Sequence, residues 1–312
     1  MRSALPVLLL IPIALTFLLS GCSSYRPFAD VRREVPQSQF VRLGDQLVHV
    51  EQAGQGEPVV LLHGFGASSY SWRKVIPALS ASHRVVAIDL NGFGYTERPR
   101  DPAAYTREGQ ATLVLGVMDA LGIDRAHVAG HSYGGGLSLF LATIHPERFR
   151  TLILVDSSAP TYPDDRRSRI ASSRPLANLF VRAVALRPAM VRRSLEASVF
   201  DRSRVTPELV RAYLDRLRIE GAEDAFYGLT VPRCAPGPKV QLDQIRVPTL
   251  AVWGAEDRLI SLASGRRSVA RIPGSEFVTI ESCGHMPMEE KPEELLKALL
   301  PFLERHRGEP AR

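Results

Sequence analysis

The five residues Gly-His-Ser-Tyr-Gly at positions 130–134 constrain the fold of this chain more than any other feature of its sequence. A short strand-like run at 127–129 precedes them, and a stretch with helical spacing of apolar residues at 137–144 follows. The glycines on both sides of Ser132 have no Cβ atoms, so the backbone can turn there more tightly than other residues allow. The pattern therefore predicts a strand, a strained turn and a helix, with the Ser132 hydroxyl projecting above the edge of a sheet.

The rest of the chain alternates short β-branched runs with amphipathic stretches. The stretches 111–121 and 292–303 carry apolar residues at three- and four-residue spacing, as a helix lying on a sheet requires. The expected strands are 47–50, 59–62, 85–88, 127–129, 152–155, 250–253 and 277–280. Strands that alternate with helices imply a mostly parallel sheet with helices on both faces, which is an α/β fold.

The alternation stops between about residues 162 and 240, where Arg-rich and Leu/Val-rich stretches are punctuated by prolines. These stretches predict several short helices. Because an insertion of this length between two strands is too long for a loop, we expect a helical cap over 161–240. The core of the fold then consists of 38–160 together with 241–306.

The first 21 residues predict an export signal. Arg2 supplies a positive start, and the apolar run from Leu5 to Leu19 is short for a membrane span and contains prolines. The run ends in Leu-Ser-Gly-Cys, which resembles the lipobox of bacterial lipoproteins, and the resemblance implies that Cys22 is lipidated and becomes the first mature residue. Each buried CH₂ of a lipid chain contributes about 0.8 kcal/mol, so several chains on Cys22 would hold the protein on a membrane. An uncleaved anchor and secretion without lipid stay open.

Residues 22–37 are polar, charged and marked by prolines, and they show no helical or alternating period. We expect them to form a tether that lets the folded body stand off the membrane. Ser23 follows Cys22, and in lipoproteins of this type a residue other than Asp there implies the outer membrane of a Gram-negative cell. The expected location is the bacterial cell envelope, with the protein lipid-anchored and facing the periplasm.

A serine hydroxyl is a weak nucleophile at neutral pH and needs a base, and the base needs an acid to orient it. Asp257 follows the expected strand 250–253, and His285 follows the last expected strand. Both therefore come to the carboxyl edge of the sheet, where open α/β sheets place their ligands. We predict Ser132 as nucleophile, His285 as base and Asp257 as acid.

Two other carboxyl groups remain alternatives for the acid. Glu256 is adjacent to Asp257, and Asp156 ends the expected strand 152–155. Asp89 begins an Asp-x-x-Gly-x-Gly sequence, where we expect it to hydrogen-bond within a tight turn. His131 flanks Ser132 but comes too early in the chain to reach over it as the base.

The sequence His-Gly-Phe-Gly at 63–66 directly follows the expected strand 59–62. Taken with the Asp-x-x-Gly-x-Gly turn and the loops of Ser132, Asp257 and His285, it resembles the motif order of the α/β-hydrolase family over about residues 40–303. The resemblance implies an eight-stranded, mostly parallel sheet with helices on both faces and a helical cap inserted after the sixth strand. It also implies an oxyanion hole formed by the backbone N–H groups of Phe65 and Tyr133.

The same resemblance implies an enzyme that cleaves a carboxylic ester or a related small acyl substrate through an acyl-enzyme. Carbon–carbon bond hydrolases, lactonases and perhydrolases of the family also use a serine, so they stay open as alternatives. A catalytically idle receptor that uses the cap pocket is a weaker alternative. Dehalogenases and epoxide hydrolases use an Asp nucleophile, and Ser132 argues against both.

Composition argues against nucleic-acid binding. The 312-residue chain has a formal net charge of +6, but its basic residues are mostly Arg and are not grouped with aromatics. No phosphate loop or metal cluster is apparent, so we expect no cofactor and no metal. Arg exceeds Lys throughout, so the Arg content of the cap does not by itself predict lipid contact. Cys234 and Cys283 could pair after export, but nothing in the sequence places them within reach of each other.

Overall fold

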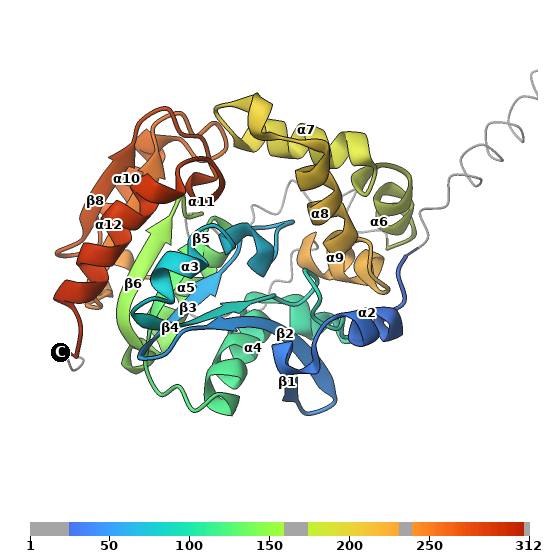
Figure 1. Cartoon of the computed structure of the whole chain (residues 1–312), viewed down its shortest axis with the longest axis horizontal. Coiled ribbons are helices and arrows are strands. Elements are labelled where there is room, and N and C mark those ends of the chain that lie inside the picture. The colour runs from blue at the N-terminus through green and yellow to red at the C-terminus, as the bar shows by residue number, and fades with distance from the viewer. Residues whose placement is uncertain (1–24, 159–173, 231–238, 309–312) are drawn as a thin grey trace, which may run out of the picture.

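The computed structural model describes residues 25–158, 174–230 and 239–308, and its centre is an eight-stranded sheet (Figure 1). The strand order is β1-β2-β4-β3-β5-β6-β7-β8, with β1 and β2 antiparallel to their neighbours and the other pairs parallel. The strands are β1 Phe40–Leu43, β2 Gln46–Ala53, β3 Glu57–Leu62, β4 His83–Ile88, β5 Ala126–His131, β6 Phe149–Val155, β7 Thr249–Gly254 and β8 Glu276–Ile280. This order and direction confirm the expected mostly parallel sheet.

Helices cover both faces of the sheet, which explains why the central strands are apolar at successive positions. Strand β5 is buried along its whole length. On one face lie α4 (Arg107–Ala120), α5 (Tyr133–Ile144) and α10 (Leu262–Val269), which share a buried apolar cluster with the strands. On the other face, α3 (Ile76–Leu79) and α12 (Pro292–Arg305) contribute to a second cluster.

Four helices described between β6 and β7 form the cap, as expected for an insertion after the sixth strand. They are α6 Arg174–Phe180, α7 Pro188–Ser198, α8 Pro207–Leu217 and α9 Ala222–Thr230. The prolines that broke the alternation of the sequence begin α7 and α8, where a missing N–H costs nothing. The Thr206 hydroxyl caps α8 by accepting the N–H of Leu209.

The N-terminal segment differs from the expected tether without secondary structure. Residues Phe28–Glu34 form helix α2, and Gln37–Gln39 form a 3-10 turn. Val31 and Val35 of this segment are buried against Ile219 of the cap. The apolar stripe that this packing requires is only two helical turns long, so it did not register as a period in the sequence. The described part of this segment therefore lies on the folded body.

Some predicted features lie outside the described residues. These are the export signal, Cys22 and Cys234. Cys283 is a buried free thiol whose pKa is raised by burial. Within the ranges that the structure describes, no helix is long and apolar enough to cross a membrane.

Candidate active site

Ser132 lies in the turn between β5 and α5, with φ 48° and ψ −112°. A positive φ is strained for a residue with a side chain, and it persists only where the surroundings hold it. Here the Ser132 N–H donates to the carbonyl of Val155 over 3.0 Å. The Ser132 carbonyl accepts the N–H groups of Gly136 and Ser158, each over 3.0 Å. The predicted strained turn is therefore present and is held from both sides.

The two glycines of the turn are required for packing rather than for a positive φ. A Cβ atom on Gly130 would overlap the carbonyl group of Gly134. A Cβ atom on Gly134 would in turn overlap the carbonyl of Leu62 at the end of β3. Larger residues at either position would push the serine away from the sheet edge.

The loop at residues 63–66 packs directly against this turn. A Cβ atom on Gly64 would lie 2.7 Å from His131 Nδ1 and 3.2 Å from Ser132 Cβ, so only glycine permits the approach. The His63 side chain holds the loop in place through two hydrogen bonds. Its Nε2 accepts the N–H of Leu90 over 3.0 Å, and this leaves Nδ1–H to donate to the Gly64 carbonyl over 2.8 Å. Burial lowers the pKa of His63 and keeps it in this neutral form.

Two backbone N–H groups beside Ser132 have no backbone acceptor within the described chain. They belong to Phe65 and Tyr133, whose rings lie 6.3 Å apart. Tyr133 is the first residue of α5, where the helix dipole adds partial positive charge. Free N–H groups in this position can receive a developing oxyanion.

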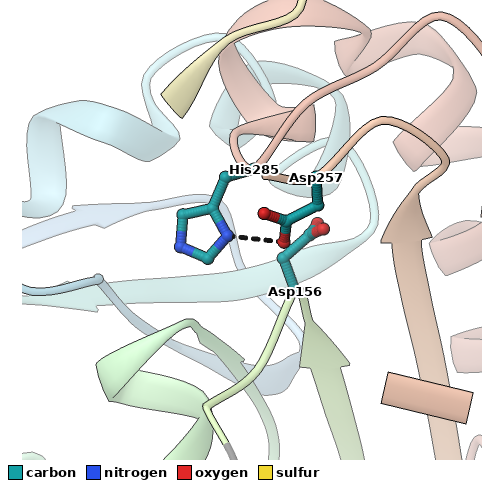
Figure 2. Close-up of side chains that lie close together, drawn as sticks. All are labelled: Asp156, Asp257 and His285. Atoms are coloured by element: carbon teal, nitrogen blue, oxygen red, sulfur yellow. Dashed lines mark hydrogen bonds and ion pairs between the residues drawn. The ribbon is translucent and has the colours of Figure 1, made fainter. Parts of the chain in front are cut away.

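His285 and Asp257 meet above the carboxyl edge of the sheet (Figure 2). His285 Nδ1 and Asp257 Oδ2 are 2.7 Å apart. Asp257 Oδ1 accepts the N–H groups of Leu259 over 2.7 Å and Ile260 over 2.9 Å. Burial pushes the pKa of Asp257 up, but the bonds from His285 and Ile260 outweigh it, so the pKa is lowered and the group is a carboxylate. The remaining ring nitrogen of His285, Nε2, is left to act on a substrate or on Ser132.

The structure brings Asp257 and His285 together as predicted, but it shows no hydrogen bond between the Ser132 hydroxyl and His285, both of which lie in the described part of the chain. Such bonds are often long before a substrate binds. Glu256, an alternative acid, instead accepts the N–H of Cys283 over 2.9 Å and braces the loop of His285. Asp89 accepts the N–H of Tyr95 over 2.8 Å, which confirms its expected role within the turn.

Asp156, the other alternative acid, lies beside Asp257 at the end of β6 (Figure 2). Its backbone has φ 41°, and its Oδ1 accepts the N–H of Gly254 over 3.0 Å. Burial and the neighbouring Asp257 carboxylate raise the pKa of Asp156 well above its usual range. The raised pKa favours the neutral form of Asp156, while the Asp257 carboxylate holds the histidine.

Asp156, Asp257 and His285 have the donor types of a metal site, and their ligand atoms lie within 4.8 Å of one another. A metal needs deprotonated ligands with free lone pairs. In this cluster the His285 Nδ1 is bonded to Asp257, and the raised pKa of Asp156 opposes the loss of its proton. The donor set fits an acid that orients a base better than it fits an ion.

Glu290, in helix α11 (Pro287–Glu290), ties the loop of His285 to the cap, and no motif in the sequence indicated it. Its Oε1 accepts the N–H of Gly284 over 2.9 Å, and its Oε2 accepts the N–H of Phe200 over 2.7 Å. The N–H of His285 itself donates to the carbonyl of Ser198, at the end of α7, over 2.8 Å. The position of the histidine therefore depends on how the cap is seated.

A cavity of about 290 Å³ lies between the cap and the loop of Phe65. Its lining includes Phe226 and Leu195 of the cap, and Met286, which follows His285. Among the described residues that line this cavity, none is charged. The cavity suits an apolar, uncharged part of a substrate.

These features and a comparison with known families define the class of the protein. A profile of the alpha/beta hydrolase fold matches residues 57–292, which include the Ser132 turn, the loop of Phe65 and the loops of Asp257 and His285. The chain belongs to the α/β-hydrolase family, and it is an enzyme of that family.

The chain is similar in sequence to two hydrolases with named substrates. The 2-hydroxymuconate semialdehyde hydrolase of Pseudomonas sp. strain CF600 is 31% identical over 247 residues, which cover 76% of this chain and 83% of the relative. The 2-hydroxy-6-oxononadienedioate/2-hydroxy-6-oxononatrienedioate hydrolase of Paraburkholderia phymatum is 31% identical over 291 residues, which cover 86% of this chain and 96% of the relative.

Solved structures similar to this one include two kinds of hydrolase. A variant of the meta-cleavage product hydrolase CumD of Pseudomonas fluorescens is 27% identical, with a TM-score of 0.70 over 85% of this chain and 97% of its own. A thermophilic esterase from Thermogutta terrifontis is 25% identical, with a TM-score of 0.70 over 86% of this chain and 97% of its own. The fold is therefore shared by neighbours named for different substrates.

Proposed function

We propose that this protein is a serine hydrolase in which Ser132 attacks a carbonyl carbon of the substrate. His285 Nε2 takes the proton of the Ser132 hydroxyl as the new bond forms, and Asp257 holds the opposite side of the ring and stabilises its charged form. The N–H groups of Phe65 and Tyr133 receive the oxyanion. The observation that carries this proposal is the 2.7 Å bond between His285 and Asp257, beside a serine held at φ 48°.

The cycle closes in two further steps. The tetrahedral intermediate expels the leaving group, which takes its proton from His285, and an acyl-enzyme remains on Ser132. A water molecule then gives a proton to His285 as it attacks the acyl carbon, and His285 passes that proton to the Ser132 oxygen as the carboxylic acid leaves. An ester loses an alcohol in the first step, whereas a carbon–carbon bond adjacent to a ketone loses a stabilised carbanion.

For the bond that is cleaved, the comparisons favour a carbon–carbon bond over the ester that the sequence led us to expect. Two of the relatives at 31% identity match most of this chain, one named as a hydrolase of 2-hydroxymuconate semialdehyde and the other as a hydrolase of 2-hydroxy-6-oxononadienedioate. We therefore propose carbon–carbon hydrolysis of a dienoate of this kind as the leading activity. A carboxylic ester is the second candidate. The described residues that line the cavity include no cation, and a dienoate would need one to bind its carboxylate groups, whereas an ester would not.

Parallel assays of the purified protein separate the two candidates. One follows the loss of dienoate absorbance from 2-hydroxy-6-oxo-6-phenylhexa-2,4-dienoate, and the other follows nitrophenol release from butyrate and octanoate esters. A higher kcat/KM on the dienoate supports carbon–carbon hydrolysis. Turnover of the esters alone would reject the leading candidate in favour of the second. Ser132→Ala should lower either activity by about a thousandfold or more.

We also propose that the protein is a lipoprotein of the bacterial cell envelope, anchored through Cys22 and facing the periplasm. The support is the Leu-Ser-Gly-Cys sequence at the end of the apolar N-terminal run. Cells that express the chain and are fed labelled palmitate should incorporate the label into it, and Cys22→Ser should abolish the incorporation. Equal labelling of the two proteins would reject the anchor.

A further inference from the structure

The described chain begins on the cap rather than at a distance from it. The Tyr25 hydroxyl donates to Glu223 of α9 over 3.0 Å. The backbone of Arg26 makes two hydrogen bonds with the backbone of the cap. Its N–H donates to the Arg218 carbonyl over 2.8 Å, and its carbonyl accepts the Glu220 N–H over 2.9 Å. In Figure 1 the described N-terminal segment, including α2, lies at the end of the molecule that carries α6 and α9.

Chain length then limits where Cys22 can be. Cys22 precedes Tyr25 by three residues, and three fully extended residues span about 11 Å at most. A lipid on Cys22 would therefore place the membrane surface close to the part of the cap that binds Tyr25. This is a shorter connection than the expected tether of 22–37.

The same end of the cap exposes large apolar side chains. Leu179 is 59% exposed and Phe180 is 45% exposed, although both are large hydrophobic residues. Their helix, α6, is held to α9 by the ion pair of Arg174 with Asp224, at 2.6 Å. Arg182, in the turn that follows α6, pairs with Glu223, the residue that also binds Tyr25. Helix α6 and the start of the described chain thus both bind to α9.

A row of aromatic rings leads from this surface to the site. The rings of Phe180 and Phe226 have centroids 6.1 Å apart, and those of Phe226 and Phe65 are 6.4 Å apart. All three side chains line the apolar cavity. The cavity therefore extends from the exposed α6 to the residue whose N–H belongs to the oxyanion site.

We propose that the α6 end of the cap lies on the surface of a lipid bilayer, so that the cavity receives its substrate from the membrane. The substrate class that fits is an uncharged amphiphile with an apolar acyl or alkyl chain, which corresponds to the carboxylic ester, the second candidate function, rather than to the charged dienoate. The proposal rests on the lipid anchor at Cys22 proposed above. The folded body then sits on the membrane through its cap, and the exposed Leu179 and Phe180 contact the lipid.

Tryptophan fluorescence tests this orientation. The native Trp72 and Trp253 are 0% and 1% exposed, so the quencher cannot contact them and their emission is a constant background. Leu179→Trp introduces a reporter on α6, and Thr112→Trp introduces a matched one at an exposed position of α4, a helix that packs on the sheet. The lipidated full chains are reconstituted into vesicles with acyl chains brominated near the headgroup. We expect the reporter at position 179 to lose at least half of its emission, and the one at 112 to lose less than a tenth.

The outcomes are separable. Proteins that float with the vesicles but show equal quenching at both positions would overturn the proposed orientation while the anchor stands. A blue-shifted but unquenched reporter at 179 would assign the surface to a second copy of the chain and also overturn it. Failure of the full chain to float, with the same behaviour as Cys22→Ser, would reject the anchor itself.

A kinetic test addresses substrate delivery. Leu179 does not line the cavity, so Leu179→Glu should leave hydrolysis of a water-soluble substrate unchanged. The same variant should lower turnover of a long-chain ester dissolved in vesicles about fivefold or more, whereas Thr112→Glu should not. Equal rates of Leu179→Glu and the unaltered protein on the vesicle substrate would contradict delivery from the membrane.

Discussion

Asp156 and Asp257 place their carboxyl groups within 4.8 Å of each other, and only Asp257 bonds to His285. The pKa of Asp257 is lowered and that of Asp156 is raised, because the two groups have different partners. Asp257 accepts two backbone N–H groups and the histidine, whereas Asp156 accepts one N–H and is otherwise buried. The acid of the site is thus assigned by hydrogen bonding and not by position along the chain.

This assignment predicts that the Asp→Asn substitution has a small effect on activity at position 156 and a large effect at position 257. Asp156→Asn keeps a neutral side chain and the acceptor for Gly254, so kcat/KM should stay within about threefold of the unaltered protein. Asp257→Asn removes the charge that orients His285 and should lower kcat by about 10⁴-fold. Steady-state kinetics on any accepted substrate measure both. A large loss in Asp156→Asn with a small loss in Asp257→Asn would make Asp156 the acid.

Glu290 should act as a positioning residue for His285. Glu290→Ala leaves the buried N–H group of Gly284 and the partly buried N–H group of Phe200 without their acceptor, at a cost of about 1–3 kcal/mol for the buried group. The loop of His285 would shift, so kcat should fall by about 10–100-fold. Glu290→Gln keeps one acceptor oxygen and should recover most of the activity. Denaturant unfolding, measured beside kcat, separates the two effects. Unchanged kcat in Glu290→Ala would remove the residue from this role.

His131 predicts how stability depends on pH. Burial and the neighbouring His285 lower the pKa of His131 to about 3, whereas an unfolded histidine titrates near 6.5. The folded state therefore binds fewer protons, and the contribution of neutral His131 is fully present above about pH 6.5. It is lost progressively as the pH falls from about 6.5 toward 3.

Urea unfolding at pH 7.5 and pH 5 measures this contribution. The unaltered protein should lose more unfolding free energy between the two pH values than His131→Asn, which cannot take up a proton. His145→Asn, at a half-exposed position of the same chain, serves as the control and should behave like the unaltered protein. Equal losses in the unaltered protein and His131→Asn would contradict the lowered pKa.

The parts of the molecule that could be predicted from the sequence are those with local signals. The strand, turn and helix around Ser132 follow from two glycines and the apolar runs that flank them. Asp257 and His285 follow from their places directly after strands β7 and β8. In each case the information lies within about ten residues of the feature.

The parts that could not be predicted depend on distant partners. Helix α2 is stabilised by burial of Val31 against Ile219, and its own sequence is too short to show a period. The role of Glu290 depends on the N–H of Phe200, 90 residues away, which lies in the cap. The raised pKa of Asp156 depends on burial and on Asp257, whose own pKa is lowered chiefly by His285.

The central claim is that Ser132 is the nucleophile, and covalent labelling tests it most directly. The full chain is incubated with a fluorophosphonate and analysed by intact and peptide mass spectrometry, with Ser132→Ala in parallel. We expect one adduct per chain, on the peptide that contains Ser132, and in the variant no adduct and a turnover lowered by about a thousandfold or more. An adduct on another residue, or turnover retained by Ser132→Ala, would contradict it.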